Sequence, residues 1–281
     1  MSVQEQTWDG DELPADKPRR RSLPSVTLKP AHWALISVAS VVALWWLVGA
    51  AGWVPALFLP PPQDVARKLL TLTTSGYMDA TLQQHLLASL QRMALALAAA
   101  VVIGVPLGVI IGVYPLARHL LDPLIEFYRP LPPLAYLPLI VIWCGIGEGS
   151  KVLLILLAIL APVLLATVHG VASVSPLRQQ VALTLGASRR QLLWHVILPG
   201  ALPDILTGIR IGLGAGWSTL VAAELVAATR GLGFMIQSAA QFLATDVVLA
   251  GIIVIALVAF AMELALRALQ RRLTPWHGKA H

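Results

Sequence analysis

Ionisable residues inside long apolar stretches are the positions where this sequence could do chemistry. They are few, and they comprise Arg92, Asp122, Glu126, Arg129, Glu224, Asp246 and Glu263. A charge at the centre of a bilayer costs at least about 2.5–3.5 kcal/mol on insertion scales, so such a residue usually faces a partner or a water-filled cavity. Arg129 is the best candidate for meeting a small oxyanion, because a guanidinium offers paired donors to tetrahedral oxygens. It could also reach an interface or pair with Glu126, which is the more usual arrangement.

A second group of polar candidates lies in the apolar stretch 208–228. Glu224, together with Trp217 and Ser218, could line a path through this segment. Alternatively, Glu224 is a structural charge that pairs with Arg230. The sequence leaves both interpretations open.

The proline-rich residues 130–138, which include Pro133 and Tyr136, predict a broken helix. Broken helices are tolerated in a bilayer where protein or water satisfies the freed carbonyl groups. Such breaks tend to lie beside transport pathways. The segment is therefore expected either near a pore or in a kinked packing helix.

The sequence contains no motif for nucleotide binding, metal binding or disulfide formation. The stretch GIGEGSKV around Lys151 lacks the spacing of a phosphate-binding loop, and GLGAG at residues 212–216 follows no strand and favours close helix packing instead. The histidines form no His-x-x-x-His pair, so no metal site is predicted. The single cysteine, Cys144, excludes an intrachain disulfide framework and is typical of plain packing.

The composition is that of a membrane protein. Of 281 residues, 57% are hydrophobic and 12% are charged, and the mean hydropathy is +0.77. Soluble domains carry about 25% charged residues, so an ordinary water-soluble globule is excluded, as is intrinsic disorder. The net charge of +6 is interpreted as the charge bias of cytoplasmic loops and not as nucleic-acid binding.

About six apolar stretches are long enough to be transmembrane helices, which need roughly 20 residues each. They cover residues 31–51, 86–113, 120–144, 152–172, 208–228 and 247–266, and the third is interrupted by prolines. We therefore predict an all-α polytopic membrane protein with a flexible cytoplasmic tail (1–30), a transmembrane domain (31–270) and a cytoplasmic C-terminal tail (271–281). A cleavable signal is the weaker interpretation of the first stretch.

The positive charges predict the orientation of these helices. Fourteen of the twenty Lys and Arg residues fall on the side that holds both termini, and four fall on the other. Because cytoplasmic loops carry the excess of Lys and Arg, both termini are expected in the cytoplasm. An even number of spans requires the same arrangement.

The long cytoplasmic connection 173–207 has its own pattern. Ser175 and Pro176 predict a helix start, and Gly186 predicts its end. Ser188 can cap a second short helix that Pro199 and Gly200 would end, with Pro203 at the start of the next span. The two amphipathic helices could rest on lipid or dock a soluble partner.

The same connection resembles the EAA loop of ABC-importer permeases. Nine residues separate Gly186 from the run Val196-Ile197-Leu198-Pro199, as in that motif, whereas Gln180-Val181-Ala182 stands where the family has Glu-Ala-Ala. The resemblance implies that this loop forms coupling helices seated in a cleft of an ATPase subunit. The residues carried over to that role are Gln180, Ala182, Gly186, Val196, Leu198 and Pro199.

The resemblance extends over most of the chain after the tail. RPLPPLAYLPLIVIWCGIGEGSK and the terminal RALQRRLTPWHG are similar to the sulfonate, nitrate and taurine branch of these permeases, and SGYMDATLQQHLLASL and FLATDVVLAGI are nearest to its taurine importers. This implies a type I ABC-importer permease fold in a bacterial inner membrane, and transport of taurine or a related sulfonate by alternating access. The resemblance thus implies a transport function and not an enzymatic one.

The resemblance also implies the partners. They are a second copy of the chain, two cytoplasmic ATPase subunits that carry ATP and magnesium, and an extracytoplasmic substrate-binding protein. This chain itself is expected to bind no cofactor, metal or nucleic acid. The alternatives are a permease of the same family for alkanesulfonates, nitrate or another small solute and, from other classes, an ion channel or an intramembrane enzyme.

Overall fold

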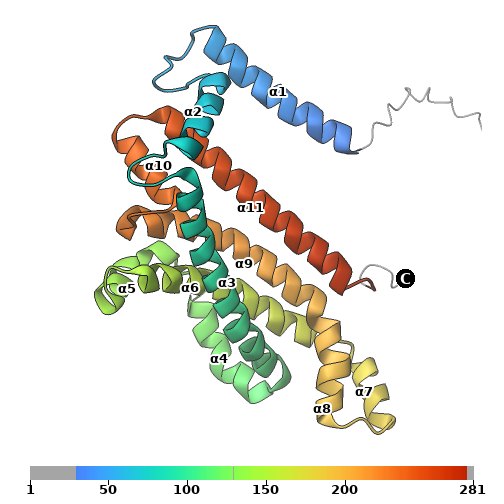
Figure 1. Ribbon diagram of the computed structural model, residues 1–281. Helices are drawn as coiled ribbons and strands as arrows, with labels where there is room; N and C mark the ends of the chain where they lie inside the picture. The colour runs from blue at the N-terminus through green and yellow to red at the C-terminus, as the bar shows by residue number, and fades with distance from the viewer. Residues whose placement is uncertain (1–29, 129, 277–281) are drawn as a thin grey trace, which may run out of the picture. The chain divides into compact units, whose positions relative to one another are not determined.

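The computed structural model describes residues 30–128 and 130–276 (Figure 1). The predicted N-terminal tail therefore lies outside the described residues except for its last position, and so does Arg129. The chain divides into two compact units, residues 1–44 and 45–281. The helix α1 (Pro30–Ala50) begins in the first unit and coincides with the first predicted span.

The rest of the described chain is helical. No β-strand occurs among residues 30–128 and 130–276, so the all-α prediction is confirmed. The elements after α1 are α2 (Pro62–Thr74), α3 (Leu82–Val113), α4 (Pro115–Tyr128), η1 (Pro133–Ala135), α5 (Leu137–Cys144), α6 (Glu148–Ala172), α7 (Pro176–Thr184), α8 (Arg189–Leu192), η2 (Leu193–Ile197), α9 (Leu198–Ala227), α10 (Leu232–Gln241) and α11 (Thr245–Leu273).

Four described helices are long and apolar enough to cross a membrane. They are Leu82–Val113, Glu148–Ala172, Arg189–Val226 and Thr245–Leu273, and they correspond to the second, fourth, fifth and sixth predicted spans. Within α1, the stretch Leu35–Ala50 is apolar but shorter. The last of the four extends past residue 270, so the predicted C-terminal tail begins inside α11.

The third predicted span, residues 120–144, is broken as expected. Its residues fall into the end of α4, the single turn η1 and the short helix α5. Prolines lack the amide donor that a helix interior needs, and they disfavour helical backbone in the residue before them. The four prolines between Pro130 and Pro138 therefore prevent one continuous helix.

The core of the second unit is a three-helix layer in which α6 packs against both α3 and α9 (Figure 1). Glycines permit this close packing. A Cβ atom added at Gly108 of α3 would lie 2.6 Å from the Cβ of Thr167, and one at Gly216 of α9 would lie 2.8 Å from the Cδ1 of Ile159. Small residues let membrane helices approach closely, so the packing role predicted for the GLGAG segment is confirmed.

A second apolar cluster joins α2, α10 and α11. Its buried members include Val65, Leu72, Met235 and Val247. The helix α10 follows α9 after a short turn in which Gly231 has φ +141°, in the region that favours glycine. This cluster fixes the turn between α9 and α10 beside the start of α3, where polar side chains gather.

The helices of residues 173–207 differ from the prediction at two points. The first helix begins at Pro176 and ends before Gly186 as expected, but the Ser175 hydroxyl makes no capping hydrogen bond. The second helix does not stop at Pro199, and Pro203 does not start a new one. Instead α8, η2 and α9 run on as one helix, with a π-turn over Leu193–Ile197 in which the Leu198 amide donates to the Leu193 carbonyl. The widened turn accommodates a proline whose ring would clash with the carbonyl four residues earlier in a regular α-helix.

Candidate functional site

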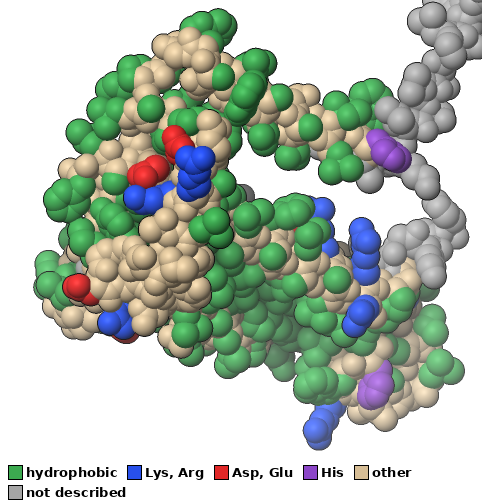
Figure 2. Space-filling view, turned by 45° about the horizontal axis from the view of Figure 1, so that its top comes forward, with side chains coloured by type: hydrophobic (Ala, Val, Ile, Leu, Met, Phe, Trp, Pro, Cys, Tyr) green, Lys and Arg blue, Asp and Glu red, His purple; other side chains and the backbone are tan. Residues whose placement is uncertain are grey.

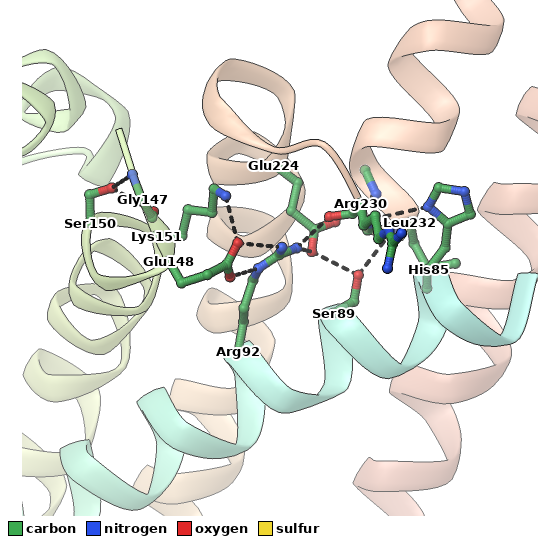
Figure 3. A network of polar contacts seen from close by, with 12 residues as sticks. His85, Ser89, Arg92, Gly147, Glu148, Ser150, Lys151, Glu224, Arg230 and Leu232 are labelled. Carbon is green, nitrogen blue, oxygen red and sulfur yellow. Dashed lines mark hydrogen bonds and ion pairs between the residues drawn. The ribbon is translucent and has the colours of Figure 1, made fainter. Parts of the chain in front are cut away.

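Arg92 of α3 lies at the centre of an ionic network that is buried at Arg92 and Glu224 and exposed at Glu148 (Figure 3). Its Nε and Nη2 atoms donate to the Glu148 carboxylate at 2.6 and 2.9 Å, and its Nη1 atom donates to Glu224 Oε1 at 2.6 Å. The arginine side chain is 5% exposed and that of Glu224 is fully buried. The paired contact with Glu148 is the bidentate geometry in which arginine binds carboxylates most strongly.

The Glu224 carboxylate has further donors. Ser89 Oγ donates to Oε1 at 2.7 Å, and the Gly233 amide, in the first turn of α10, donates to Oε2 at 2.8 Å. A carboxylate near a helix N-terminus is also stabilised by the helix dipole. Glu224 is therefore satisfied by an arginine and a hydroxyl from α3 and by the N-terminal end of α10.

The turn before α10 is tied to α3 by neutral hydrogen bonds. The Leu232 amide donates to Ser89 Oγ at 2.9 Å, and the Gly231 amide donates to His85 Nδ1 at 3.1 Å. A Cβ atom at Gly231 would collide with the Glu224 carboxylate. Glycine is required there both for its backbone conformation and for the close approach of the acid.

The network corrects the partner that was predicted for Glu224. The ionic partner of Glu224 is Arg92, whereas Arg230 contributes only its backbone carbonyl, which accepts from Arg92 Nη1 at 2.8 Å. The role of Glu224 in a path stays a prediction. Three members of the network were not predicted from the sequence: Ser89, Glu148, and Lys151, whose Nζ atom donates to Glu148 Oε1 at 2.8 Å. One signal was available, because His85, Ser89 and Arg92 recur at helical spacing along α3 and therefore share one face.

An apolar cavity of about 530 Å³ is the second candidate site. It lies between the broken third segment, α6 and α9, and is lined by Tyr128, Leu131, Pro133, Tyr136, Leu157, Ala158, Ala161, Pro162, Leu165, Ala166, Ile211 and Ala215. Pro133 and Tyr136, both singled out from the sequence, are in this lining. Its size suits a small organic molecule.

Two tyrosine hydroxyls provide the polar contacts at this cavity. Tyr128 Oη donates to the Leu157 carbonyl at 2.9 Å, and the two hydroxyl oxygens of Tyr128 and Tyr136 lie 3.1 Å apart. A hydroxyl has one proton. Since the Tyr128 proton is used by Leu157, Tyr136 donates to Tyr128, and its own oxygen is left with acceptor capacity.

The remaining path candidates lie elsewhere. Trp217 is 6% exposed within the α3–α6–α9 core, and its Nε1 atom has no hydrogen-bond partner among the described residues. Ser218 is exposed on α9, one turn beyond the cavity-lining Ala215. The structure thus brings together two of the six predicted path residues, while Arg129 lies outside the described residues.

The segment 173–207 presents an exposed apolar surface. The helix α7 ends in a Schellman motif, with hydrogen bonds of 3.0 Å from the Gly186 amide to Leu183 and from the Ala187 amide to Ala182, and Gly186 has φ +85°. Ser188 and Gln191 then form a capping box for α8. The large exposed apolar side chains, called the hairpin surface below, are Leu177, Val181, Leu183, Leu185 and Trp194.

The predicted coupling residues have different degrees of exposure. Gln180 and Gly186 are exposed, whereas Ala182, Val196, Leu198 and Pro199 are half-buried. The first two positions are therefore accessible to a partner, and the other four are less accessible. Among the described residues, no group of three His, Cys, Asp or Glu side chains is arranged to hold a metal ion.

Comparison with known proteins adds the family. A family described as "Binding-protein-dependent transport system inner membrane component" matches residues 104–275. The chain is 65% identical to the taurine transport system permease protein TauC of Escherichia coli K12 over 86% of this chain and 89% of that protein. It is 38% identical to the putative aliphatic sulfonates transport permease protein SsuC of the same organism over 90% and 94% of the two chains.

Solved structures show the same fold. The MetNI methionine ABC transporter, in an inward-facing conformation, matches with a TM-score of 0.59 at 18% identity, covering 66% of this chain and 93% of that one. An amino acid ABC transporter crystallised with histidines matches with a TM-score of 0.56 at 19% identity, covering 75% and 96%. At these identities the likeness concerns the fold alone.

Proposed function

Since this chain belongs to the family of binding-protein-dependent transport system inner membrane components, we propose that its substrate is taurine or a closely related sulfonate. As a member of that family, it is a multi-pass inner-membrane permease of an ABC importer and works with an ATPase and a binding protein. The observation that carries the substrate assignment is the much higher identity to the taurine permease protein than to the aliphatic sulfonate one.

The assembly that we propose contains two copies of this chain, two cytoplasmic ATPase subunits and one extracytoplasmic binding protein. ATP and magnesium bind to the ATPase subunits, since this sequence carries no phosphate-binding loop. Both termini face the cytoplasm, and the excess of Lys and Arg on that side supports this orientation. The hairpin surface then projects toward the ATPase.

The hairpin surface is suited to this docking. Its side chains are apolar, and two short helices that meet at a glycine can enter a groove of a partner. Gln180 and Gly186 lie at the contact, and Ala182, Val196, Leu198 and Pro199 hold the turn in place. Movement of the ATPase would reach α9 directly, because α8, η2 and α9 form one helix.

The cavity is proposed as part of the translocation path. The hydroxyl chain from Tyr136 through Tyr128 to Leu157 leaves acceptor capacity on Tyr136, which suits the ammonium end of taurine. The two aromatic rings can add a cation–π contribution. Arg129, next in sequence to Tyr128, remains the candidate for the sulfonate, and Ser218 and Trp217 are placed further along α9.

Uptake measurements test the substrate assignment. A host that lacks its own taurine permease is supplied with this chain, its ATPase and its binding protein, and uptake of radiolabelled taurine is followed with ethanesulfonate, nitrate or unlabelled taurine as competitors. We expect ATP-dependent taurine uptake that unlabelled taurine abolishes. Uptake inhibited by ethanesulfonate and not by taurine would instead favour an alkanesulfonate permease, and solute currents without ATP would favour a channel.

The cavity is tested by Tyr136→Phe. This change removes the acceptor oxygen but keeps the ring, so taurine uptake should fall about tenfold, as expected when one hydrogen bond to a charged group is lost. The matched control is Tyr114→Phe, since Tyr114 is exposed and outside the cavity lining. Equal uptake by both variants would remove Tyr136 from the path.

A further inference from the structure

We propose that a basic pocket at the C-terminal end of α11 binds a phosphate-type oxyanion, supplied either by the headgroup of an anionic phospholipid or by free phosphate. The pocket has a volume of about 410 Å³ and is lined by Arg210, Arg267, Gln270, Arg271 and Thr274. In Figure 2, Lys and Arg side chains gather near this end of α11, and the acidic side chains visible on that face lie elsewhere. The pocket is separate from the network of Arg92 and from the tyrosine-lined cavity.

The charges in the pocket do not balance within the described chain. Glu263 Oε1 accepts from Arg210 Nη2 at 2.7 Å and from Arg267 Nε at 2.8 Å, so one carboxylate serves two guanidinium groups. Among residues 30–128 and 130–276, Arg271 takes part in no ion pair. Three arginines and one glutamate leave two positive charges, which favours an anion.

The donors are also held in place for a ligand. The contact to Glu263 uses the Nε atom of Arg267 and leaves its two terminal nitrogens available. Arg271 follows one helical turn later, on the same face of α11. Gln270 is fixed between them, because its Oε1 accepts from Arg210 Nη1 at 3.1 Å and its Nε2 donates to Thr207 Oγ1 at 3.3 Å. Paired guanidinium groups match the oxygens of a phosphate.

The position along α11 fits a lipid headgroup. The helix begins at Thr245, and 22 residues precede Arg267. At 1.5 Å per residue they span about 33 Å, close to the roughly 30 Å hydrocarbon core of a bilayer. Arg267 and Arg271 therefore lie at the level of the headgroups, and basic pockets between helices at that level bind anionic lipids.

Native mass spectrometry of the permease, co-purified with its ATPase in neutral detergent, tests the pocket. Phosphatidylglycerol and phosphatidylcholine are titrated separately, and we expect preferential retention of phosphatidylglycerol. Each arginine near the membrane surface contributes about fivefold to the affinity for an anionic lipid, so the double variant Arg267→Gln, Arg271→Gln should weaken the retention of phosphatidylglycerol at least tenfold. Glu263 keeps Arg210 as a partner in this variant, and an unchanged melting temperature would show that the fold is intact.

Arg272→Gln is the matched control, because Arg272 is the next residue on α11, is exposed, and is absent from the pocket lining. It should change retention less than about threefold, as a surface charge does. Excess inorganic phosphate distinguishes the two sources of the oxyanion. If phosphate displaces the lipid, or binds when no lipid is present, the oxyanion alone suffices for binding. If phosphate does not displace the lipid, the pocket is a lipid site. Equal retention of both lipids without phosphate binding, or equal loss in Arg272→Gln, would overturn the proposal.

Discussion

The ionic network around Arg92 and the hairpin surface at the opposite end of α9 are built on contrary principles. In the network, the charged and hydrogen-bonding groups find their partners within the chain, on α3, α6, α9 and the start of α10. Glu224 is fully buried there. On the hairpin surface, five large apolar side chains are exposed, with Leu185 at 83%. The first region is completed by the chain itself, whereas the second leaves its apolar side chains exposed, and we propose that the ATPase covers them.

This difference separates stability from assembly. A substitution in the network should destabilise the isolated permease and should impair transport only because the fold is less stable. A change on the hairpin surface should leave the isolated permease intact and weaken its complex with the ATPase. Each substitution below is therefore judged by two measurements, the melting temperature of the permease and the amount of ATPase that co-purifies with it.

The largest effect is expected for Glu224→Leu. It leaves Arg92 with Glu148 alone and removes the acceptor of Ser89 and of the Gly233 amide, and breaking a buried pair from one side costs about 3–5 kcal/mol. Thermal unfolding in detergent should show a large fall in melting temperature. Glu148→Gln is the comparison within the network, because the Glu148 side chain is 64% exposed and loss of its charge should cost less than loss of the buried Glu224. If both variants melt like the unaltered protein, the network does not stabilise the fold.

Gly186→Val should act on the hairpin alone. Its φ of +85° is strained for a β-branched residue by about 1–2 kcal/mol, and the Schellman turn would open. We expect normal insertion in the membrane, with a several-fold loss of transport and of co-purified ATPase. Gly149→Val is the control, since an added Cβ there meets nothing within 4 Å and the backbone is not left-handed. Unchanged co-purification with Gly186→Val would contradict the coupling role.

Leu185→Ser sharpens the contrast by removing contact surface without backbone strain. Burial of a leucine side chain contributes about 1.5–3 kcal/mol, so the affinity for the ATPase should fall about tenfold or more while the melting temperature is unchanged. Leu57→Ser, at another exposed apolar position (53%), serves as control. Titration of the ATPase onto purified permease gives the affinity. Equal affinities for both variants would remove Leu185 from the docking surface.

The two regions also differ in how far the sequence predicts them. The hairpin depends on local signals, and Pro176, Gly186 and Ser188 do what their residue types predict at a helix start, a helix end and a cap. The continuation of the helix past Pro199 was missed, because a π-turn depends on how the whole segment packs. The broken third span follows from its prolines for the same local reason.

The network depends on contacts between residues far apart in the sequence. Arg92 and Glu224 stand out as charges in apolar segments, but nothing local pairs them, and the nearer Arg230 is the obvious partner for Glu224. The true pairing follows from the side-by-side packing of α3, α6 and α9, which glycines such as Gly108 and Gly216 make possible. The sequence therefore indicates that a buried charge must be satisfied but not by which residue.

The smallest effect is expected for Gln180→Glu, which restores the acidic residue of the resembled loop. Gln180 is exposed on α7, so the change adds a charge without a desolvation cost and should leave the melting temperature unchanged. Both side chains can accept a hydrogen bond from the ATPase, and an exposed ion pair adds about 0–1 kcal/mol. The affinity for the ATPase should therefore rise by less than about fivefold and should lose that gain in high salt. A tenfold loss of affinity would mean instead that the ATPase accepts a hydrogen bond from the side-chain amide of Gln180. The polar contact at this position would then differ from the one that the EAA loop makes with its glutamate.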